Sequence, residues 1–156
     1  MYDGWDARGI MMASVRDVAR YLLNQADPDV GELISHLRLQ KLCYYAQGFH
    51  LALFDQPFFP ERIEAWTHGP VSPDLYVDYR SYASGPIPVP ETSDFSVLSD
   101  DQRELLDEVY EVYGQYSAWK LRNMTHKEAP WIEAAKNGGG VITHDAMREF
   151  FKTRLK

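Results

Sequence analysis

Apolar residues recur every three or four positions in several stretches of this chain, a spacing that predicts amphipathic α-helices. The first stretch follows Ser14, whose hydroxyl can accept from the free backbone N–H groups of a helix start. Its apolar stripe consists of Val15, Val18, Ala19, Leu22 and Leu23. The stretch from Ser35 to about Phe54 carries a broader apolar stripe. We therefore expect this second helix to lie at the centre of the fold.

Residues 73–83 and the segment after Ser99 continue the helical spacing. Pro73 suits the first turn of the earlier segment, because the N–H that proline lacks would have no helical partner there. Ser99 and Gln102 have the spacing of a capping box, in which each side chain satisfies a backbone N–H of the other residue. Gly114 is expected to end the helix that follows.

The C-terminal part of the chain predicts further short helices. Thr125 and Glu128 have capping-box spacing, but Pro130 cannot lie deep inside a helix that begins at Thr125. One of these two signals must therefore fail. Glycines 138–140 predict a flexible connection between helices, and Thr143 is placed to start the last one. Its inward-facing residues are expected to be Met147, Phe150, Phe151 and Leu155.

A small β element is predicted between the helical segments. Pro57 and Pro60 exclude a helix before it, and apolar and polar positions alternate through residues 62–67. The Pro-rich segment 85–99 excludes helix as well and is expected to cross the surface. These patterns predict a mainly α, compact helical fold with this one β element.

Length and composition predict a single globular domain. A chain of 156 residues with 45% hydrophobic and 13% aromatic residues can bury a core of its own. We expect residues 13–156 to form this domain and residues 1–12 to be a flexible N-terminal extension. The sequence has neither a leader segment nor an apolar run that could span a membrane, and we expect a cytoplasmic protein.

The net charge of −7 and the single cysteine argue against several classes of function. The negative charge opposes binding to a nucleic-acid backbone. Cys43 alone can form neither an intramolecular disulfide nor a cysteine zinc cage, and its place on an apolar stripe predicts a buried, inert thiol. The histidines lack the spacing of a helical zinc site, and the three glycines lack the Lys of a phosphate-binding loop. We therefore predict no metal and no cofactor.

Two other classes of function remain open from the residues alone. The first two helices could form a helix-turn-helix that presents Arg38 and Lys41 to DNA, as in a DNA-binding autoregulator. His68, His126 and Glu128 could instead supply the acid and base of an enzyme. Because no nucleophile motif accompanies these residues, we predict that the protein is not an enzyme.

The 10 tyrosines are more than a core of this size requires, because each buried phenol needs a hydrogen-bond partner. We therefore expect many of them to face outward as anchors for a partner protein, although Tyr44 and Tyr45 also widen the apolar stripe of the second helix. Two pairs, each spaced three residues apart, are the candidate partner contacts. They are Tyr79, Tyr82, Tyr113 and Tyr116.

Three ordered motifs resemble the Panacea domain, the SocA-like antitoxin family that includes phage-associated GepA-type proteins. They are "LQKLCYYAQG", "WTHGPVSPDLY" and "THKEAPW", and the resemblance extends from about Val15 to Phe151. The positions that carry the motifs have a structural or partner-binding role by this resemblance. They are Gln40, Lys41, Tyr44, Tyr45, Gln47, Trp66, His68, Gly69, Pro70, Pro73, Tyr76, Thr125, His126, Glu128, Pro130 and Trp131.

The resemblance implies a helical antitoxin that neutralises a cognate toxin by direct protein–protein binding, the toxin being encoded by the adjacent gene. The two tyrosine pairs are then candidate toxin contacts. The resemblance also implies two alternatives, a proteolytic adaptor that delivers the toxin to a protease and a regulator of its own operon. A role in phage defence and a homo-oligomeric state are compatible with it. Gly69, Pro70 and Pro73 restrict the backbone of the second motif, which predicts a rigid turn rather than a mobile catalytic loop.

Overall fold

The computed structural model describes residues 11–27, 29, 33–91 and 94–155 of the chain. Its helices are α1 (Val15–Gln25), α2 (His36–Phe54), α3 (Pro73–Tyr79), α4 (Asp100–Tyr113), α5 (Ala118–Thr125), α6 (Ala129–Lys136) and α7 (His144–Lys152). Its strands are β1 (Ile34–Ser35), β2 (Glu64–Trp66), β3 (Gly69–Val71) and β4 (Pro86–Ile87), and a 3-10 turn, η2 (Arg80–Tyr82), follows α3. The mainly α fold is therefore confirmed. Residues 1–10 of the expected N-terminal extension lie outside the described residues.

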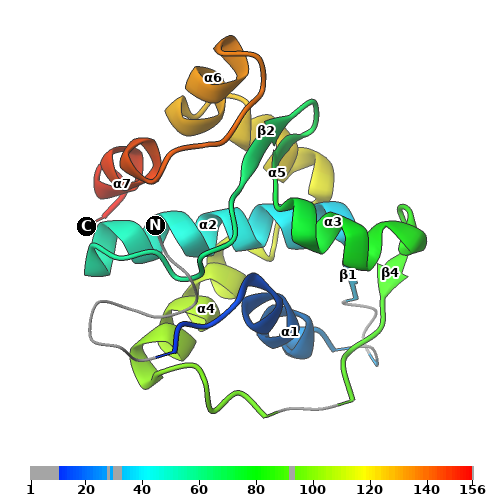
Figure 1. The fold of residues 1–156 in the computed structure, drawn as a ribbon. Helices are drawn as coiled ribbons and strands as arrows, with labels where there is room; N and C mark the ends of the chain where they lie inside the picture. The colour runs from blue at the N-terminus through cyan, green and yellow to red at the C-terminus, as the bar shows by residue number, and fades with distance from the viewer. Residues whose placement is uncertain (1–10, 28, 30–32, 92–93, 156) are drawn as a thin grey trace.

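Helix α2 runs through the centre of the fold, as its broad apolar stripe predicts (Figure 1). Helices α1 and α4 lie on one side of it, and α5, α6, α7 and the β2–β3 hairpin lie on the other. Most of its 19 residues are buried, including Tyr44 and Tyr45. The Ser35 hydroxyl caps the helix start by accepting from the backbone N–H of Arg38.

Three of the predicted helix starts are confirmed. Ser14 caps α1 and, with Asp17, completes a capping box. Ser99 and Gln102 form the predicted capping box of α4, and Thr143 caps α7. These local signals were readable because a cap and the backbone N–H groups that it binds lie within three residues of each other.

The predicted helix start at Thr125 is wrong. Helix α5 ends at Thr125, whose hydroxyl donates to the backbone carbonyl of Arg122 at 2.8 Å. Helix α6 starts only at Ala129, which leaves Pro130 in the first turn, where its missing N–H costs no helical hydrogen bond. Of the two competing signals, the proline therefore decided the boundary.

The predicted β element contains β2, which pairs antiparallel with the unpredicted β3 to form a hairpin, with Ala65 opposite Pro70. The other edge of β2 is covered by the glycine segment, because Ala65 N–H donates to the Gly140 carbonyl at 3.0 Å. Gly138 and Gly139 have φ values of +93° and +81°, which few other residues adopt. The glycines were expected to be a flexible connection, but they lie along β2 instead.

A second pair of strands was not predicted. Strands β1 and β4 pair antiparallel, with Ile34 opposite Ile87 and both side chains buried. Each strand has only two residues, and β4 lies inside the segment that was expected to be a Pro-rich surface connector. Two residues cannot display a periodic pattern, so this pairing depends on contacts between distant parts of the chain.

Helix α7 packs against α2 at a glycine. A Cβ atom on Gly48 would lie 2.1 Å from Cε2 of Phe151, so only glycine allows this approach. Met147 and Phe151 are buried, as predicted, and Phe150 is partly buried. The inward placement of Leu155 is wrong, because α7 ends at Lys152 and Leu155 is 38% exposed.

Cys43 is buried on α2, and burial raises the pKa of its thiol well above the ordinary value. This position agrees with the predicted inert thiol. Within the ranges that the structure describes, no helix is long and apolar enough to cross a bilayer.

Candidate functional site

The first motif supplies side chains that hydrogen-bond to the backbone of neighbouring loops. Gln40 Oε1 accepts from Ser72 N–H at 2.8 Å, and Gln40 Nε2 donates to the Ser72 carbonyl at 3.1 Å. Two turns further along α2, Gln47 accepts from Phe58 N–H at 2.6 Å and donates to the Phe59 carbonyl at 2.9 Å. Each buried amide therefore holds a loop against α2 through a donor and an acceptor at once.

The orientation of the Gln40 amide determines the tautomer of its neighbour His36, that is, which ring nitrogen carries the proton. Gln40 Nε2 also contacts His36 Nε2 at 3.0 Å. Because the amide nitrogen can only donate, this ring nitrogen accepts, and the proton of the neutral ring lies on Nδ1. Burial, and secondly the charge of Lys41, lower the pKa of His36, which agrees with a neutral ring.

Lys41 is fully buried beneath the hairpin. Its Nζ donates to the Pro70 carbonyl at 3.1 Å, and a Cβ on Gly69 would lie 2.7 Å from its Cε and 2.8 Å from Thr125 Oγ1. The φ of Gly69 is +112°, which adds a second reason for glycine at this position. Burial, and secondly the charge of Arg122, lower the pKa of Lys41 to about 7.

This burial corrects the helix-turn-helix hypothesis. Lys41 was expected to face a DNA backbone, but it has an exposed fraction of 0% and faces the hairpin. Arg38, its expected companion, donates through Nη2 to the backbone carbonyl of Gly114. A lysine and an arginine that are occupied in this way cannot form the phosphate-contacting surface of a recognition element.

Glu128 of the third motif binds two tyrosines of the first. Its Oε1 and Oε2 accept from the hydroxyls of Tyr44 and Tyr45 at 3.0 and 2.8 Å. Burial raises the pKa of Glu128 to about 7, while these two hydrogen bonds oppose the increase. Tyr44 and Tyr45 are therefore not among the outward-facing tyrosines, because one buried carboxyl group accepts from both phenols.

His126 and Trp131 connect the third motif to the hairpin. Trp131 Nε1 donates to the Trp66 carbonyl at 2.9 Å. The two ring nitrogens of His126 contact the carbonyl oxygens of Arg122 and Thr67, Nδ1 at 2.7 Å and Nε2 at 2.8 Å. Because a carbonyl oxygen only accepts, the ring nitrogen that carries the proton is the one that donates to its carbonyl. The third motif thus holds α5 and α6 to the turn between β2 and β3.

The three residues of the enzyme alternative do not form one acid–base set. His68 and His126 lie on either side of Arg122, whose Nε donates to His68 Nδ1 at 3.2 Å. Glu128 is held in the interior by the two tyrosines instead. Across the described residues, no three His, Cys, Asp or Glu side chains gather as a metal site.

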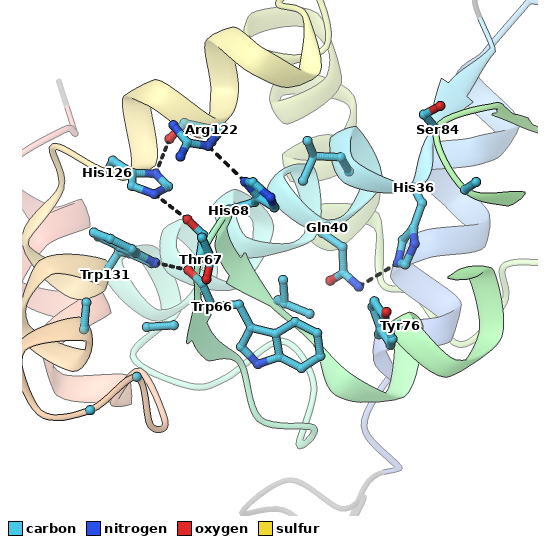
Figure 2. Close-up of a pocket in the computed structure, with 17 residues that line it drawn as sticks. His36, Gln40, Trp66, Thr67, His68, Tyr76, Ser84, Arg122, His126 and Trp131 are labelled. Carbon is cyan, nitrogen blue, oxygen red and sulfur yellow. Dashed lines mark hydrogen bonds between the residues drawn. The ribbon is translucent and has the colours of Figure 1, made fainter. Parts of the chain in front are cut away.

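An open groove of about 1180 Å³ lies over the hairpin (Figure 2). Its walls come from the start of α2, the hairpin, α3, α5, α6 and the glycine segment. The lining residues are His36, Leu37, Gln40, Ala65, Trp66, Thr67, His68, Val71, Tyr76, Ala83, Ser84, Arg122, His126, Trp131, Ala135, Gly138 and Gly139. Members of all three motifs therefore border one surface.

The four candidate toxin contacts lie in different surroundings. The rings of Tyr79 and Tyr82 are 6.3 Å apart, and Tyr82 is 40% exposed whereas Tyr79 packs against the core. Tyr113 stacks on Tyr45 with ring centroids 4.0 Å apart, and Tyr116 is partly buried against the core. Their role in binding stays a prediction.

Two side chains at the groove were not singled out from the sequence. Arg122 lines the groove, and its Cζ lies 4.5 Å from the ring centroid of Trp119, which is 59% exposed. Trp119 and Arg122 are three residues apart on α5, the spacing of neighbours on one helix face. That spacing could have predicted from the sequence that the two side chains are neighbours.

The described residues thus form a mainly helical frame with an open groove that is bordered by aromatic rings. The chain belongs to the antitoxin SocA-like, Panacea domain family, whose model matches residues 39–132. The match contains all three motifs, so the resemblance inferred from them is confirmed. Neither the curated proteins nor the solved structures that were searched include a match to this chain.

Proposed function

We propose that this protein is an antitoxin that neutralises a cognate toxin by direct binding, the toxin being encoded by the adjacent gene. One observation carries the proposal beyond family membership: the motif residues support and border a single open groove. Their polar groups hold the frame by hydrogen bonds, while aromatic rings remain accessible. Tyr76, for example, is 38% exposed, and its ring centroid lies 5.0 Å from that of Trp66.

The geometry favours strong binding for two physical reasons. Aromatic side chains bury large areas at small cost in side-chain entropy, and they often supply most of the binding energy. The hairpin that carries Trp66 is held by Lys41, His126 and Trp131, so little backbone freedom is lost on binding. We infer that the protein acts by binding in the cytoplasm and not by catalysis.

Co-expression with the adjacent gene tests this proposal. We expect that gene to be toxic alone, to be tolerated with the antitoxin, and to yield a complex that remains intact through size-exclusion chromatography. A toxin that is neutralised without a complex would contradict direct binding. Repeating the rescue in a host that lacks its ATP-dependent proteases identifies the adaptor alternative, because only an adaptor requires a protease.

Two further measurements address the two other classes of function, an enzyme and a DNA-binding regulator. A double variant, His68→Ala with His126→Ala, separates catalysis from binding: because no proton transfer is needed, any neutralisation that it loses should match a loss of the toxin complex. Loss of neutralisation with the complex preserved would favour an enzyme. A mobility-shift assay on the protein's own promoter should show no retardation of the DNA. Low salt is the condition to use, because any phosphate contacts are strongest there.

A further inference from the structure

The groove differs in charge from the rest of the protein. The chain has a net charge of −7, yet the residues that line the groove include Arg122 and three histidines and no Asp or Glu, all of them within the described ranges. The hairpin's own carboxylate, Glu64, is bound by Arg62 Nε at 2.6 Å and by Trp66 Nε1 at 2.9 Å. An acidic protein therefore presents a groove of cationic and neutral donors.

Two of these donors lie side by side and face the groove. Arg122 uses Nε to bind His68 and Nη1 to bind Asn123 Oδ1 at 3.1 Å. Among the described residues, Nη2 has no protein partner, so it can donate to a ligand. Because Arg122 donates to His68 Nδ1, the proton of neutral His68 lies on Nε2, and this ring is exposed. The pair can bind the two oxygens of one carboxylate.

Lys41 adds positive potential from behind the same wall. It lies against Gly69, the neighbour of His68 in the hairpin, and its charge and that of Arg122 repel each other. An anion bound at Arg122 reduces this repulsion, so anion binding is favoured by the buried lysine as well.

The size and walls of the groove fit a protein segment better than a small anion. Its volume of about 1180 Å³ exceeds the usual upper limit for small-ligand pockets, about 1000 Å³. Trp131 and Arg122 lie toward one side and His36 and Ser84 toward the other, with Trp66 between them (Figure 2). Apolar rings next to the donors match a chain that alternates carboxylate and apolar side chains.

We infer that the groove binds an acidic, extended segment of the toxin, with a carboxylate on Arg122 and His68 and apolar side chains on Trp66 and Tyr76. This inference rests on the proposed antitoxin function and specifies which chemistry the partner supplies. The toxin thus carries an Asp- or Glu-containing segment with interspersed apolar residues on the surface that the antitoxin covers.

Overlapping peptides that span the adjacent-gene toxin test the inference directly. Each peptide is added to ¹⁵N-labelled antitoxin, and the indole N–H signals of Trp66 and Trp131 are followed by NMR. We expect acidic peptides to shift these signals, and Glu→Gln versions of the same peptides to bind about tenfold more weakly or worse. Binding by basic or uncharged peptides alone, or by no peptide, would overturn the inference. A shift by inorganic pyrophosphate without any peptide would reassign the groove to a small anion.

Matched variants separate this inference from the proposed function. Arg122→Gln should weaken the intact toxin complex by about tenfold or more, Arg122→Lys should do so less, and Arg103→Gln on α4, outside the groove, should not weaken it. Arg122 binds Thr125 and His126 through its backbone carbonyl, so we expect its side-chain variants to fold. An unchanged complex with folded Arg122→Gln removes the groove assignment alone. A wild-type protein that binds no toxin removes the proposed function itself.

Discussion

Helix α4 and the groove are two surfaces of opposite character. Exposed carboxylates on α4 are Asp100, Asp101, Glu104, Asp107, Glu108 and Glu111, against one basic residue, Arg103. Residues 115–156, which include two helices of the groove, hold eight Lys and Arg against four Asp and Glu. Residues 1–114 hold eight against nineteen, so the total of −7 conceals two regions of different sign. Net charge describes long-range attraction and gives little information about what one face binds.

The comparison suggests different roles for the two surfaces in one encounter. The acidic α4 side can attract a basic toxin surface over distance, whereas the proposed contact between the groove and an acidic segment acts at short range. A toxin that contacts both surfaces must carry an acidic segment within a largely basic surface. Variants of each surface test this division of roles. The first variant below alters the core of α2, which supports both surfaces.

Leu42→Ala should have the largest effect, because both surfaces depend on the core of α2. Leu42 is fully buried, and removing its side chain should cost about 2–5 kcal/mol of unfolding free energy. Denaturant unfolding measures this loss, and we expect toxin binding through either surface to fall with it. Val112→Ala on the exposed face of α4 is the control and should change stability by less than about 0.5 kcal/mol. Equal midpoints for the two variants would show that α2 is not the common frame.

Glu128→Gln should raise stability in a pH-dependent manner. Because burial raises the folded-state pKa of Glu128 to about 7, its stabilising contribution is complete below about pH 4.5 and is lost as the pH rises through 7. The advantage of the variant over wild type should therefore grow over this window, by on the order of 2 kcal/mol. Unfolding midpoints measured from pH 4.5 to 8 provide the test, and a constant difference would contradict it.

Lys41→Met is the matched control for that pH profile. The folded-state pKa of Lys41 is lowered to about 7, so its contribution is present above pH 10.5 and is lost as the pH falls toward 7. Any advantage of Lys41→Met should accordingly shrink above pH 7, opposite to the trend for Glu128→Gln. The same trend for both variants would show that general unfolding, and not these two groups, sets the profile.

Tyr82→Ala and Tyr113→Ala should separate binding from packing. Tyr82 is exposed near the groove, so its loss should weaken the toxin complex by about 2 kcal/mol if it is an anchor, with the unfolding midpoint unchanged. Tyr113 stacks on buried Tyr45, so its loss should mainly lower the unfolding midpoint and not act directly on binding. Calorimetric titration and thermal unfolding of both variants provide the comparison. Normal binding by a folded Tyr82→Ala protein would exclude Tyr82 as an anchor.

Neutralising the acidic face of α4 should have the smallest effect. A triple variant, Glu104→Gln, Glu108→Gln and Glu111→Gln, should slow association with the toxin at low salt and leave dissociation unchanged. The expected change in binding free energy is below about 1 kcal/mol, because these carboxylates are exposed. Stopped-flow rates at two salt concentrations measure it. Faster dissociation in the variant would mean that α4 contacts the toxin directly.

Local signals in the sequence were sufficient for most helices. Ser14, Ser99 and Thr143 predicted their helix starts, because a cap acts on N–H groups within three residues. Thr125 failed because the same residue can cap one helix or end the helix before it. Pro130 selected between these outcomes, because it fits the first turn of a helix but not its interior.

The candidate site was less predictable because its buried polar groups have partners far away in sequence. Lys41 and Pro70 are 29 residues apart, and Tyr44 and Glu128 are 84 apart. From sequence, a lysine on a helix suggests an exposed cation, and paired tyrosines suggest surface anchors. The motifs single out these positions, but their partners appear only when the helices meet.

The sequence by itself determined the mainly helical class, the central helix, the β element of residues 62–67 and the Panacea family, because each depends on spacing within short segments. Tertiary structure alone decided that Lys41 lies under Gly69, that Glu128 serves two tyrosines and that Arg122 faces an open groove. Burying a charge or a phenol is unfavourable unless a partner meets it in space. Periodicity reports which face of a segment is buried, and it carries no information about which distant group that face meets.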